Sequence, residues 1–262
     1  MIATYPLFDF ESDFVDPVQI GNGLVVSQSL IEIENLCSVN LSKEDKHHLQ
    51  KAKYCLIIDK TKHKPEQASL LFVVSCRLLK PTKVIIRYRI DSNNIVSKIR
   101  DDYSFVPTKN VTTYIGIDEL KHVSILFEGI DTFRRINTRT SNASYFIGLA
   151  YRTRKWLEGL LFHVCALETL ISSSNREQGT TQKFFDRLNY FIGYDKAKLE
   201  NIYNVRSELV HGRYLAESND RNLEYFIISE EASRLVFRKI LLDQKILNSF
   251  KDDKKRMKLF GI

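Results

Sequence analysis

Apolar and polar residues alternate with the period of a helix through most of the chain after Asp118. Apolar side chains recur there every three or four positions, which places them on one face of an amphipathic helix. The longest regular stretch runs from about Ala143 to Ser172, and we predict one long helix over it. The same spacing predicts further helices over residues 118–135, 181–192, 196–211 and 223–250.

The N-terminal half follows a mixed pattern. Ser42 and Asp45 have the spacing of a capping box, which predicts a helix from there to about Asp59. Pro65 suits the first turn of a second helix, because the N–H that proline lacks would have no partner there. This helix is apolar on most sides and is expected to end at Leu79 and to be buried.

A short β element is expected between these helices and the helical half. Residues 84–90 alternate apolar and basic, which is typical of a half-buried strand, and residues 111–115 can pair with them. The first forty residues contain two prolines and two glycines, so we expect extended or irregular chain with a short strand at 24–26.

These elements predict a mainly α protein in two regions. Residues 1–117 form an N-terminal α+β region that includes an acidic, extended arm over residues 1–42. Residues 118–262 form a second region that is helical almost throughout and ends in a basic tail.

Composition narrows the class of protein. The chain has 262 residues, of which 44% are hydrophobic and 27% are charged, as in a globular protein. Its apolar runs are too short to cross a bilayer, and its first residues lack the pattern of a secretion signal, so we expect a cytoplasmic protein. Neither the four cysteines nor the six histidines have metal-ligand spacing, so no metal and no cofactor are expected.

The net charge of +7 is unevenly distributed. Residues 1–42 carry six acids and no Lys or Arg, so the other 220 residues carry +13. Residues 80–109 and 132–157 hold much of this excess, and the second stretch contains no acid. Such density suits a polyanion such as RNA, although an ordinary solvated surface explains it equally well. The acidic segment 8–16 either docks on this basic surface or forms a solvated arm or edge strand.

Three charged residues break the apolar faces of the predicted helices. Glu168 lies on the apolar face of the long helix, and Arg187 and Arg206 lie on the apolar faces of later helices. A buried carboxylate requires a cation or several donors. We therefore expect Glu168 to form an internal ion pair with Arg187 or Arg206.

His211 lies at the end of the helix that carries Arg206, one residue before Gly212. The C-terminal end of a helix favours an imidazolium, and a ligand can reach a terminal position. Ser207 is four residues earlier and can hydrogen-bond His211. Arg206 and His211 diverge by about 140° on a regular helix, so they meet only through a distorted last turn or across a dimer. A capping histidine without chemistry is the alternative.

At this point the sequence resembles a family. Residues 203–212 read Tyr-Asn-Val-Arg-Ser-Glu-Leu-Val-His-Gly, which is similar to the Y-x-x-R-S-x-x-V-H-G signature of the Apea-like branch of the HEPN proteins. Ala166–Glu168 resembles the family's A-L-E in a long helix, and Arg187 begins a similar Arg-Leu-Asn-Tyr segment. The resemblance covers residues 141–250.

The resemblance implies a HEPN-like antiparallel bundle that forms a homodimer and cleaves RNA without a metal, as defence or toxin ribonucleases do. Arg206 and His211 would be catalytic and Ser207 would position them, with Glu168, Arg187 and Tyr203 in support. An antitoxin or trigger protein would be a further partner, and the alternative is a non-catalytic nucleotide-binding, RNA-binding or protein-interaction module. The bases expected to contact RNA are Arg134, Arg135, Arg139, Arg152, Arg154 and Lys155.

Overall fold

The computed structural model describes residues 1–29, 32, 35–36, 41–99, 111–153, 155–173, 180–213 and 220–261, and every structural statement below concerns these residues. They divide into two compact units. The N-terminal unit comprises the described residues up to Glu128, and the C-terminal unit comprises those from Gly129 onward. Among the described residues no helix is long and apolar enough to cross a membrane.

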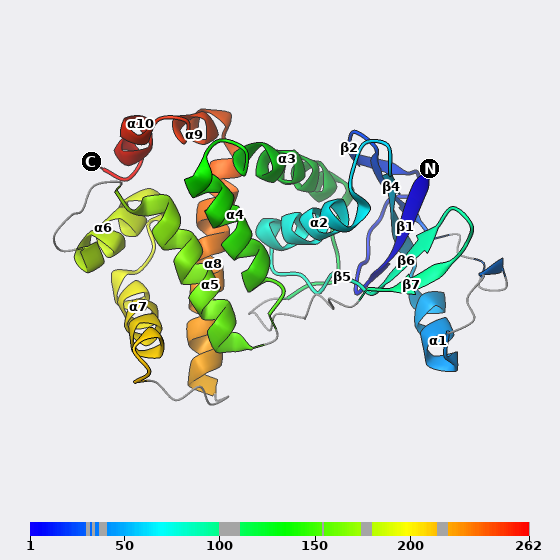
Figure 1. Cartoon of the computed structure of the whole chain (residues 1–262), viewed down its shortest axis with the longest axis horizontal. Coiled ribbons are helices and arrows are strands. Elements are labelled where there is room, and N and C mark those ends of the chain that lie inside the picture. The colour runs from blue at the N-terminus through cyan, green and yellow to red at the C-terminus, as the bar shows by residue number, and fades with distance from the viewer. Residues whose placement is uncertain are drawn as a thin grey trace. The chain divides into compact units, whose positions relative to one another are not determined.

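The N-terminal unit is built on a seven-stranded antiparallel sheet, which Figure 1 shows in blue and cyan. Its strands follow the order β2-β3-β4-β1-β6-β7, and β5 pairs with β1 beside β6. The strands are β1 (Ile2–Phe8), β2 (Val18–Gly21), β3 (Leu24–Gln28), β4 (Tyr54–Asp59), β5 (Ile85–Ile86), β6 (Tyr88–Asp91) and β7 (Val96–Lys98).

The first strand lies in the middle of this sheet, so the prediction of an extended acidic arm is wrong. β1 pairs with β4 on one side and with β5 and β6 on the other. Phe10 and Phe14, from the acidic segment, are buried against the ring of Tyr54 at centroid distances of 5.3 and 4.9 Å. The segment is therefore part of the N-terminal core, because burial of its phenylalanine rings removes apolar surface from water.

The helix expected over residues 42–59 is shorter in the structure. The capping box of Ser42 and Asp45 is confirmed, and it opens α1 (Lys43–Lys51). The remaining residues form strand β4, whose Leu56 and Ile58 are fully buried. A continuous apolar run of this length fits a buried strand as well as a helix, and pairing with β1 and β3 decides between them here.

The buried helix α2 (Pro65–Leu79) is confirmed with the expected bounds. Figure 1 shows it lying against the sheet. The expected strand over residues 84–90 is divided at Arg87 into β5 and β6. Residues 111–115 do not pair with it, because Thr112 instead forms a bridge with Thr82 and Tyr114 forms one with Glu11.

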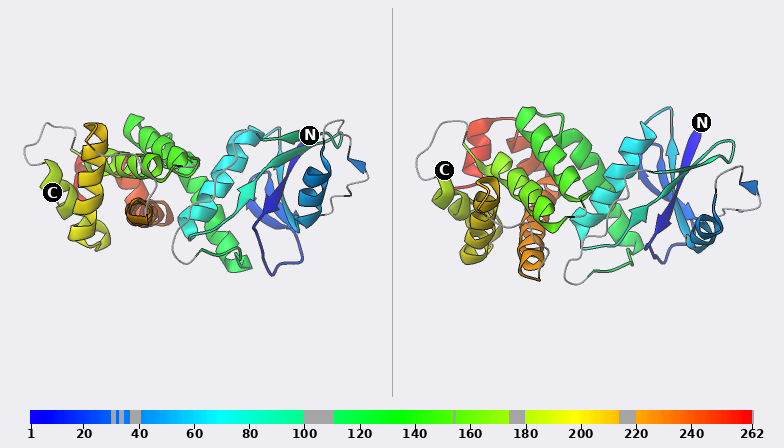
Figure 2. Two further views of the ribbon diagram at one scale, coloured as in Figure 1. Left: turned by 90° about the horizontal axis from the view of Figure 1, so that it is seen from below. Right: turned by 60° about the horizontal axis from the view of Figure 1, so that its bottom comes forward.

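Helices make up most of the remaining described chain, so the mainly α class is confirmed alongside a sheet larger than expected. Helix α3 (Ile117–Phe133) begins in the N-terminal unit and ends in the C-terminal unit. Figure 2 shows the helices of the C-terminal unit from two further sides. They are α4 (Thr138–Ala150), α5 (Trp156–Ile171), α6 (Thr180–Ile192), α7 (Lys196–Val210), α8 (Asp220–Leu242), α9 (Gln244–Ser249) and α10 (Asp253–Lys258).

The long helix predicted over residues 143–172 is two helices that pack against each other, α4 and α5. Asn137 caps α4, so α4 begins between the helix predicted over residues 118–135 and the one predicted from about Ala143. α4 ends before Tyr151, whose ring is buried and whose hydroxyl donates to Glu230 in α8 at 3.0 Å. The apolar pattern does not reveal the break between α4 and α5, because apolar residues keep the same helical spacing on both sides of it.

Helix α5 crosses α8 closely at Gly159. A Cβ atom at this position would lie 2.5 Å from the ring of Phe226, so only glycine fits without rearrangement. The neighbouring turns of α5 and α8 enclose a polar pair, in which His163 Nδ1 lies 2.6 Å from Ser233 Oγ. Both side chains are fully buried.

The sequence predicts one helix over residues 223–250 and then a basic tail. In the structure this segment contains α8 and two further short helices that pack against the unit. Asp243 caps the separate helix α9, and α10 follows. Arg256 and Met257 in α10 are buried, with exposed fractions of 1% and 8%. The basic residues of this segment therefore include a core arginine.

Candidate functional site

The candidate site lies at the C-terminal half of α7, whose start and end are both set by local capping. Asp195 accepts a hydrogen bond from the backbone of Ala197 at the start. At the end, Gly212 adopts a φ of +67°, and the amide of Arg213 donates to the carbonyl of Glu208 at 2.8 Å. This Schellman motif confirms the predicted glycine stop and makes His211 the C-cap residue.

The structure joins Arg206 to Glu168 and so decides between the two ion pairs expected from the sequence. Arg206 Nη2 donates to Glu168 Oε2 at 2.8 Å. The side chains of Arg206 and Glu168 are 25% and 23% exposed, so the pair lies at the edge of the core formed where α5 packs against α7. Shielding from water at this position strengthens the attraction relative to a surface ion pair.

Aromatic rings and a thiol surround the guanidinium. The Tyr203 ring lies one turn before Arg206, with its centroid 5.8 Å from the guanidinium carbon. Phe184 and Phe185 of α6 pack against Tyr203 at 5.3 and 5.6 Å. Arg206 also bonds the thiol of Cys165, which precedes Glu168 by three residues on α5. The sequence could have indicated this thiol as a neighbour of the ion pair, because Cys165 and Glu168 are three residues apart and so share one face of α5.

Burial dominates the protonation of this site. It raises the pKa of Glu168 above its usual value, although the Arg206 guanidinium acts in the opposite direction. Burial also raises the pKa of the Cys165 thiol, and the nearby Glu168 carboxylate adds to the effect. Cys165 is therefore held as a thiol, which argues against a nucleophilic thiolate at neutral pH.

Arg187 was the other possible ion-pair partner of Glu168, but in the structure it binds a backbone carbonyl instead. Its side chain is 5% exposed, and Nη1 donates to the carbonyl of Ile171 at 3.0 Å, at the end of α5. Two more arginines bind neighbouring carbonyls there. Arg139 donates to Thr169 and Ser172, and Arg256 donates to Leu170 and Ser172.

These three arginines satisfy carbonyls that have no partner within α5 and place positive charge at the negative end of its dipole. The sequence did not indicate this cluster, because Arg139, Arg187 and Arg256 come from three separate helices. Arg187 and Arg139 therefore act on the end of the helix that carries Glu168.

Within one chain, His211 takes no part in the ion pair between Arg206 and Glu168. Its side chain is exposed, and its backbone N–H donates to the carbonyl of Ser207 at 3.0 Å. Among the described residues, neither the Ser207 hydroxyl nor the His211 imidazole has a hydrogen-bond partner, so the expected side-chain bond between them is not formed. The backbone at His211 has φ −88° and ψ 5°, which departs from helical values and begins the turn away from α7.

The basic residues expected to contact RNA are less available than the sequence indicates. Arg134 and Arg135 both pair with Asp131, and Lys155 pairs with Glu158 at 3.0 Å. These acids directly flank the acid-free stretch 132–157, at helical spacings of three and four residues from their partners. Arg135 and Lys155 remain largely exposed, Arg139 and Arg152 are half-buried, and Arg154 lies outside the described residues.

The donor groups of the described chain do not assemble a metal site. No three His, Cys, Asp or Glu side chains come together there in a way that holds a metal ion. Cys55, Cys76 and Cys165 are free thiols, and Cys37 lies outside the described residues. Comparisons with protein-family models, with curated proteins and with solved structures find no match for the chain.

Proposed function

We propose that the protein is a metal-independent endoribonuclease of a defence or toxin type, built on a HEPN-like bundle and active as a homodimer in the cytoplasm. The observation that carries the proposal is the arrangement of α7. A half-buried Arg206 is fixed by Glu168, and an exposed His211 occupies the C-cap of the same helix. Ser207 lies between them on this helix.

The residue types suit phosphodiester transesterification. A ribose 2′-oxygen attacks the adjacent phosphorus and passes its proton to His211. The bond from phosphorus to the 5′-oxygen of the next nucleotide breaks, and that oxygen takes the proton from His211, which yields a 2′,3′-cyclic phosphate and a free 5′-hydroxyl. Imidazole accepts and donates protons near neutral pH. A guanidinium has five N–H donors, of which Glu168 engages the Nη2 group, so other donors are left to stabilise charge on the phosphate oxygens.

A homodimer would bring together two residues that a single α7 helix keeps apart. Arg206 and His211 are five residues apart, so they project about 140° away from each other on α7. Two α7 helices related by a two-fold axis would bring Arg206 of one protomer near His211 of the other. Arg135 and Lys155 would then contact the RNA backbone, and an antitoxin or trigger protein would control access.

The test is cleavage of RNA by the full chain in excess EDTA. We expect the wild type to produce fragments ending in a 2′,3′-cyclic phosphate and His211→Ala to lose at least about a hundredfold in rate. His47→Ala is the matched control, because His47 is an exposed histidine on α1, and it should cleave like the wild type. Equal cleavage by all three proteins, or none by any, would refute the catalytic assignment.

A non-catalytic module that binds a nucleotide, RNA or a protein partner is the second candidate. One observation favours it: the contacts of Arg206 with Glu168, Cys165 and Tyr203 are those of a structural residue. If Arg206 is only structural, Arg206→Ala should lower the thermal midpoint strongly. If it is catalytic, the variant should remain folded and lose cleavage.

A further inference from the structure

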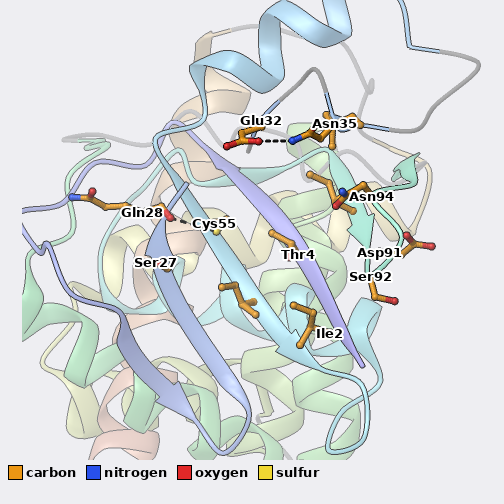
Figure 3. Close-up of a pocket in the computed structure, with 13 residues that line it drawn as sticks. Ile2, Thr4, Ser27, Gln28, Glu32, Asn35, Cys55, Asp91, Ser92 and Asn94 are labelled. Carbon is orange, nitrogen blue, oxygen red and sulfur yellow. Dashed lines mark hydrogen bonds between the residues drawn. The ribbon is translucent and has the colours of Figure 1, made fainter. Parts of the chain in front are cut away.

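Polar side chains of this protein form hydrogen bonds that differ in how far water reaches them. Figure 3 shows a hollow in the sheet of the N-terminal unit, at which Asn35 donates to the Glu32 carboxylate and both side chains are exposed. Water competes for such a bond, so it restrains the chain only weakly. At the end of α5 in the C-terminal unit, by contrast, the buried side chains of Arg187 and Arg256 bind the backbone. Bonds shielded from water in this way hold a helix end more firmly.

The last turn of α5 has four carbonyls that no N–H of the helix can reach. The last backbone bond of the helix runs from the N–H of Ser172 to the carbonyl of Glu168 at 3.0 Å. The carbonyls of residues 169–172 therefore have no partner within α5. We call the three arginines that bind all four of them the collar of α5. Arg139 donates to Thr169 and Ser172, Arg256 donates to Leu170 and Ser172, and Arg187 donates to Ile171.

The collar fixes these carbonyls relative to one another. Nη1 of Arg139 joins the carbonyls of Thr169 and Ser172, at 2.7 and 2.9 Å. Arg256 joins those of Leu170 and Ser172 through two nitrogens of its planar guanidinium, at 2.5 and 3.0 Å. Each of these guanidinium groups spans the end of the helix, so it opposes any opening of the last turn.

The collar costs more free energy than a helix end requires. Arg187 and Arg256 are buried cations, and burial lowers the pKa of Arg139, with the charge of Arg256 acting in the same direction. Asp253 offsets part of this cost by pairing with Arg256 at 2.6 Å. Carbonyl acceptors recover only part of the free energy that a guanidinium loses on leaving water. Helix α7 ends at a turn of Gly212 instead. The collar therefore indicates that the position of this turn matters beyond the need to end the helix.

The last turn of α5 carries the carboxylate that holds Arg206. Glu168 lies three residues before the helix end at Ile171, and its Oε2 accepts from Arg206 Nη2 at 2.8 Å. The other polar side chain that Arg206 contacts among the described residues is Cys165, one turn earlier on α5. Helix ends fray where nothing holds them, so an unheld last turn would displace this carboxylate. The position of the Arg206 guanidinium thus depends on the collar.

We propose that the collar positions Arg206 for catalysis, by holding the last turn of α5 and with it Glu168. The proposal rests on the proposed nuclease function and adds to it three positioning residues, from α4, α6 and α10. Arg139 then acts through α5 rather than on the RNA backbone, because its Nη1 is held by two carbonyls. A displacement of about 1 Å in a catalytic group costs about a hundredfold in rate, so a small shift of the turn is enough to be measured.

Steady-state cleavage of RNA by Arg139→Met in excess EDTA tests this role. Arg139 is the least buried residue of the collar, and methionine keeps its bulk and removes its donors. We expect kcat to fall about 10- to 100-fold with KM within about twofold of the wild type. Arg139→Lys should recover part of the loss, because an ammonium group can still donate to a carbonyl. Arg238→Met is the matched control, since Arg238 is an exposed arginine on α8, and it should cleave like the wild type. Thermal unfolding sets an assay temperature at which all four proteins are folded.

The reactivity of Cys165 reports on the position of the turn without any cleavage. Cys165 is half-exposed, and its thiol bonds Arg206. We measure its alkylation by iodoacetamide with mass spectrometry, and the buried Cys55 and Cys76 serve as internal references. Arg139→Met should raise the rate at Cys165 at least about threefold, because the thiol becomes more accessible, and Arg238→Met should react at the wild-type rate.

The outcomes distinguish a failure of this proposal from a failure of the proposed nuclease. Suppose that the wild type cleaves through His211 and that Arg139→Met keeps the wild-type kcat or changes only KM. The positioning role is then wrong and the nuclease stands. An unchanged alkylation rate of Cys165 in Arg139→Met, or an equal loss of kcat in Arg238→Met, would also overturn the positioning role. Absence of cleavage by the wild type would overturn both proposals.

Discussion

The fully buried His163 makes the stability of the C-terminal unit depend on pH. Ser233 Oγ lies 2.6 Å from His163 Nδ1 and 3.0 Å from the carbonyl of Glu230. A hydroxyl has one proton, and the carbonyl can only accept, so we assign that proton to the Glu230 carbonyl bond and the imidazole proton to Nδ1. His163 Nε2 is buried without a partner among the described residues. The ring is therefore neutral in the folded protein.

Burial lowers the pKa of His163 from 6.5 to about 3, and the nearby Arg234 adds to the effect. As pH falls below 6.5, the unfolded chain takes up a proton at this position and the folded chain does not. The free energy of unfolding therefore decreases as pH falls, by about 1.4 kcal/mol per pH unit below 6, and by about 2.5 kcal/mol in total between pH 7.5 and 4.5. Glu230 acts in the opposite direction, because burial raises its pKa.

The variant His163→Asn removes the titrating group and isolates its contribution. Urea unfolding of the full chain at pH values from 7.5 to 4.5 gives the free energy of unfolding, and fluorescence of Trp156, the single tryptophan, reports on the C-terminal unit. We expect the stability of the wild type relative to His163→Asn to fall by about 2.5 kcal/mol over this range. His47→Asn, at an exposed position, should not change the pH profile. A difference between wild type and His163→Asn that is constant with pH would refute the assignment of a neutral, buried imidazole.

Three further predictions concern packing and charge. Gly159→Ala should destabilise by about 1–3 kcal/mol in urea unfolding, because its methyl group would meet an aromatic ring of α8 at 2.5 Å, whereas Gly148→Ala, with nothing within 4 Å, should stabilise by about 0.5–1 kcal/mol. Arg256→Met should cost about 2–4 kcal/mol, since the carbonyls at the end of α5 lose donors, and the exposed Lys255→Met should cost less than about 0.5 kcal/mol in the same assay. Asp45, whose pKa is lowered by Lys98, Tyr88 and Ser42, stabilises the fold above pH 3.8 and loses this contribution as pH falls further, so acid unfolding of Asp45→Asn should show a shallower pH dependence.

Local features of the fold could be predicted closely from the sequence. The bounds of α2, the capping box at Ser42 and the glycine stop at Gly212 all depend on residues within one turn of each other. The helices α6 and α7 follow from periodicity for the same reason. The apolar faces restricted the ion-pair partner of Glu168 to Arg187 or Arg206, because a buried charge needs an opposite charge or several donors.

The features that the sequence left open depend on contacts between distant residues. Ile2–Phe8 became a central strand because β4 and β6, more than forty residues away, pair with the two edges of β1. The break between α4 and α5 became visible only when Tyr151 met Glu230 across the bundle. Sequence by itself determined where single helices begin and end and which charges need partners. The tertiary structure decided which partner each one takes, because pairing and packing energies depend on residues that the chain brings together only when it folds.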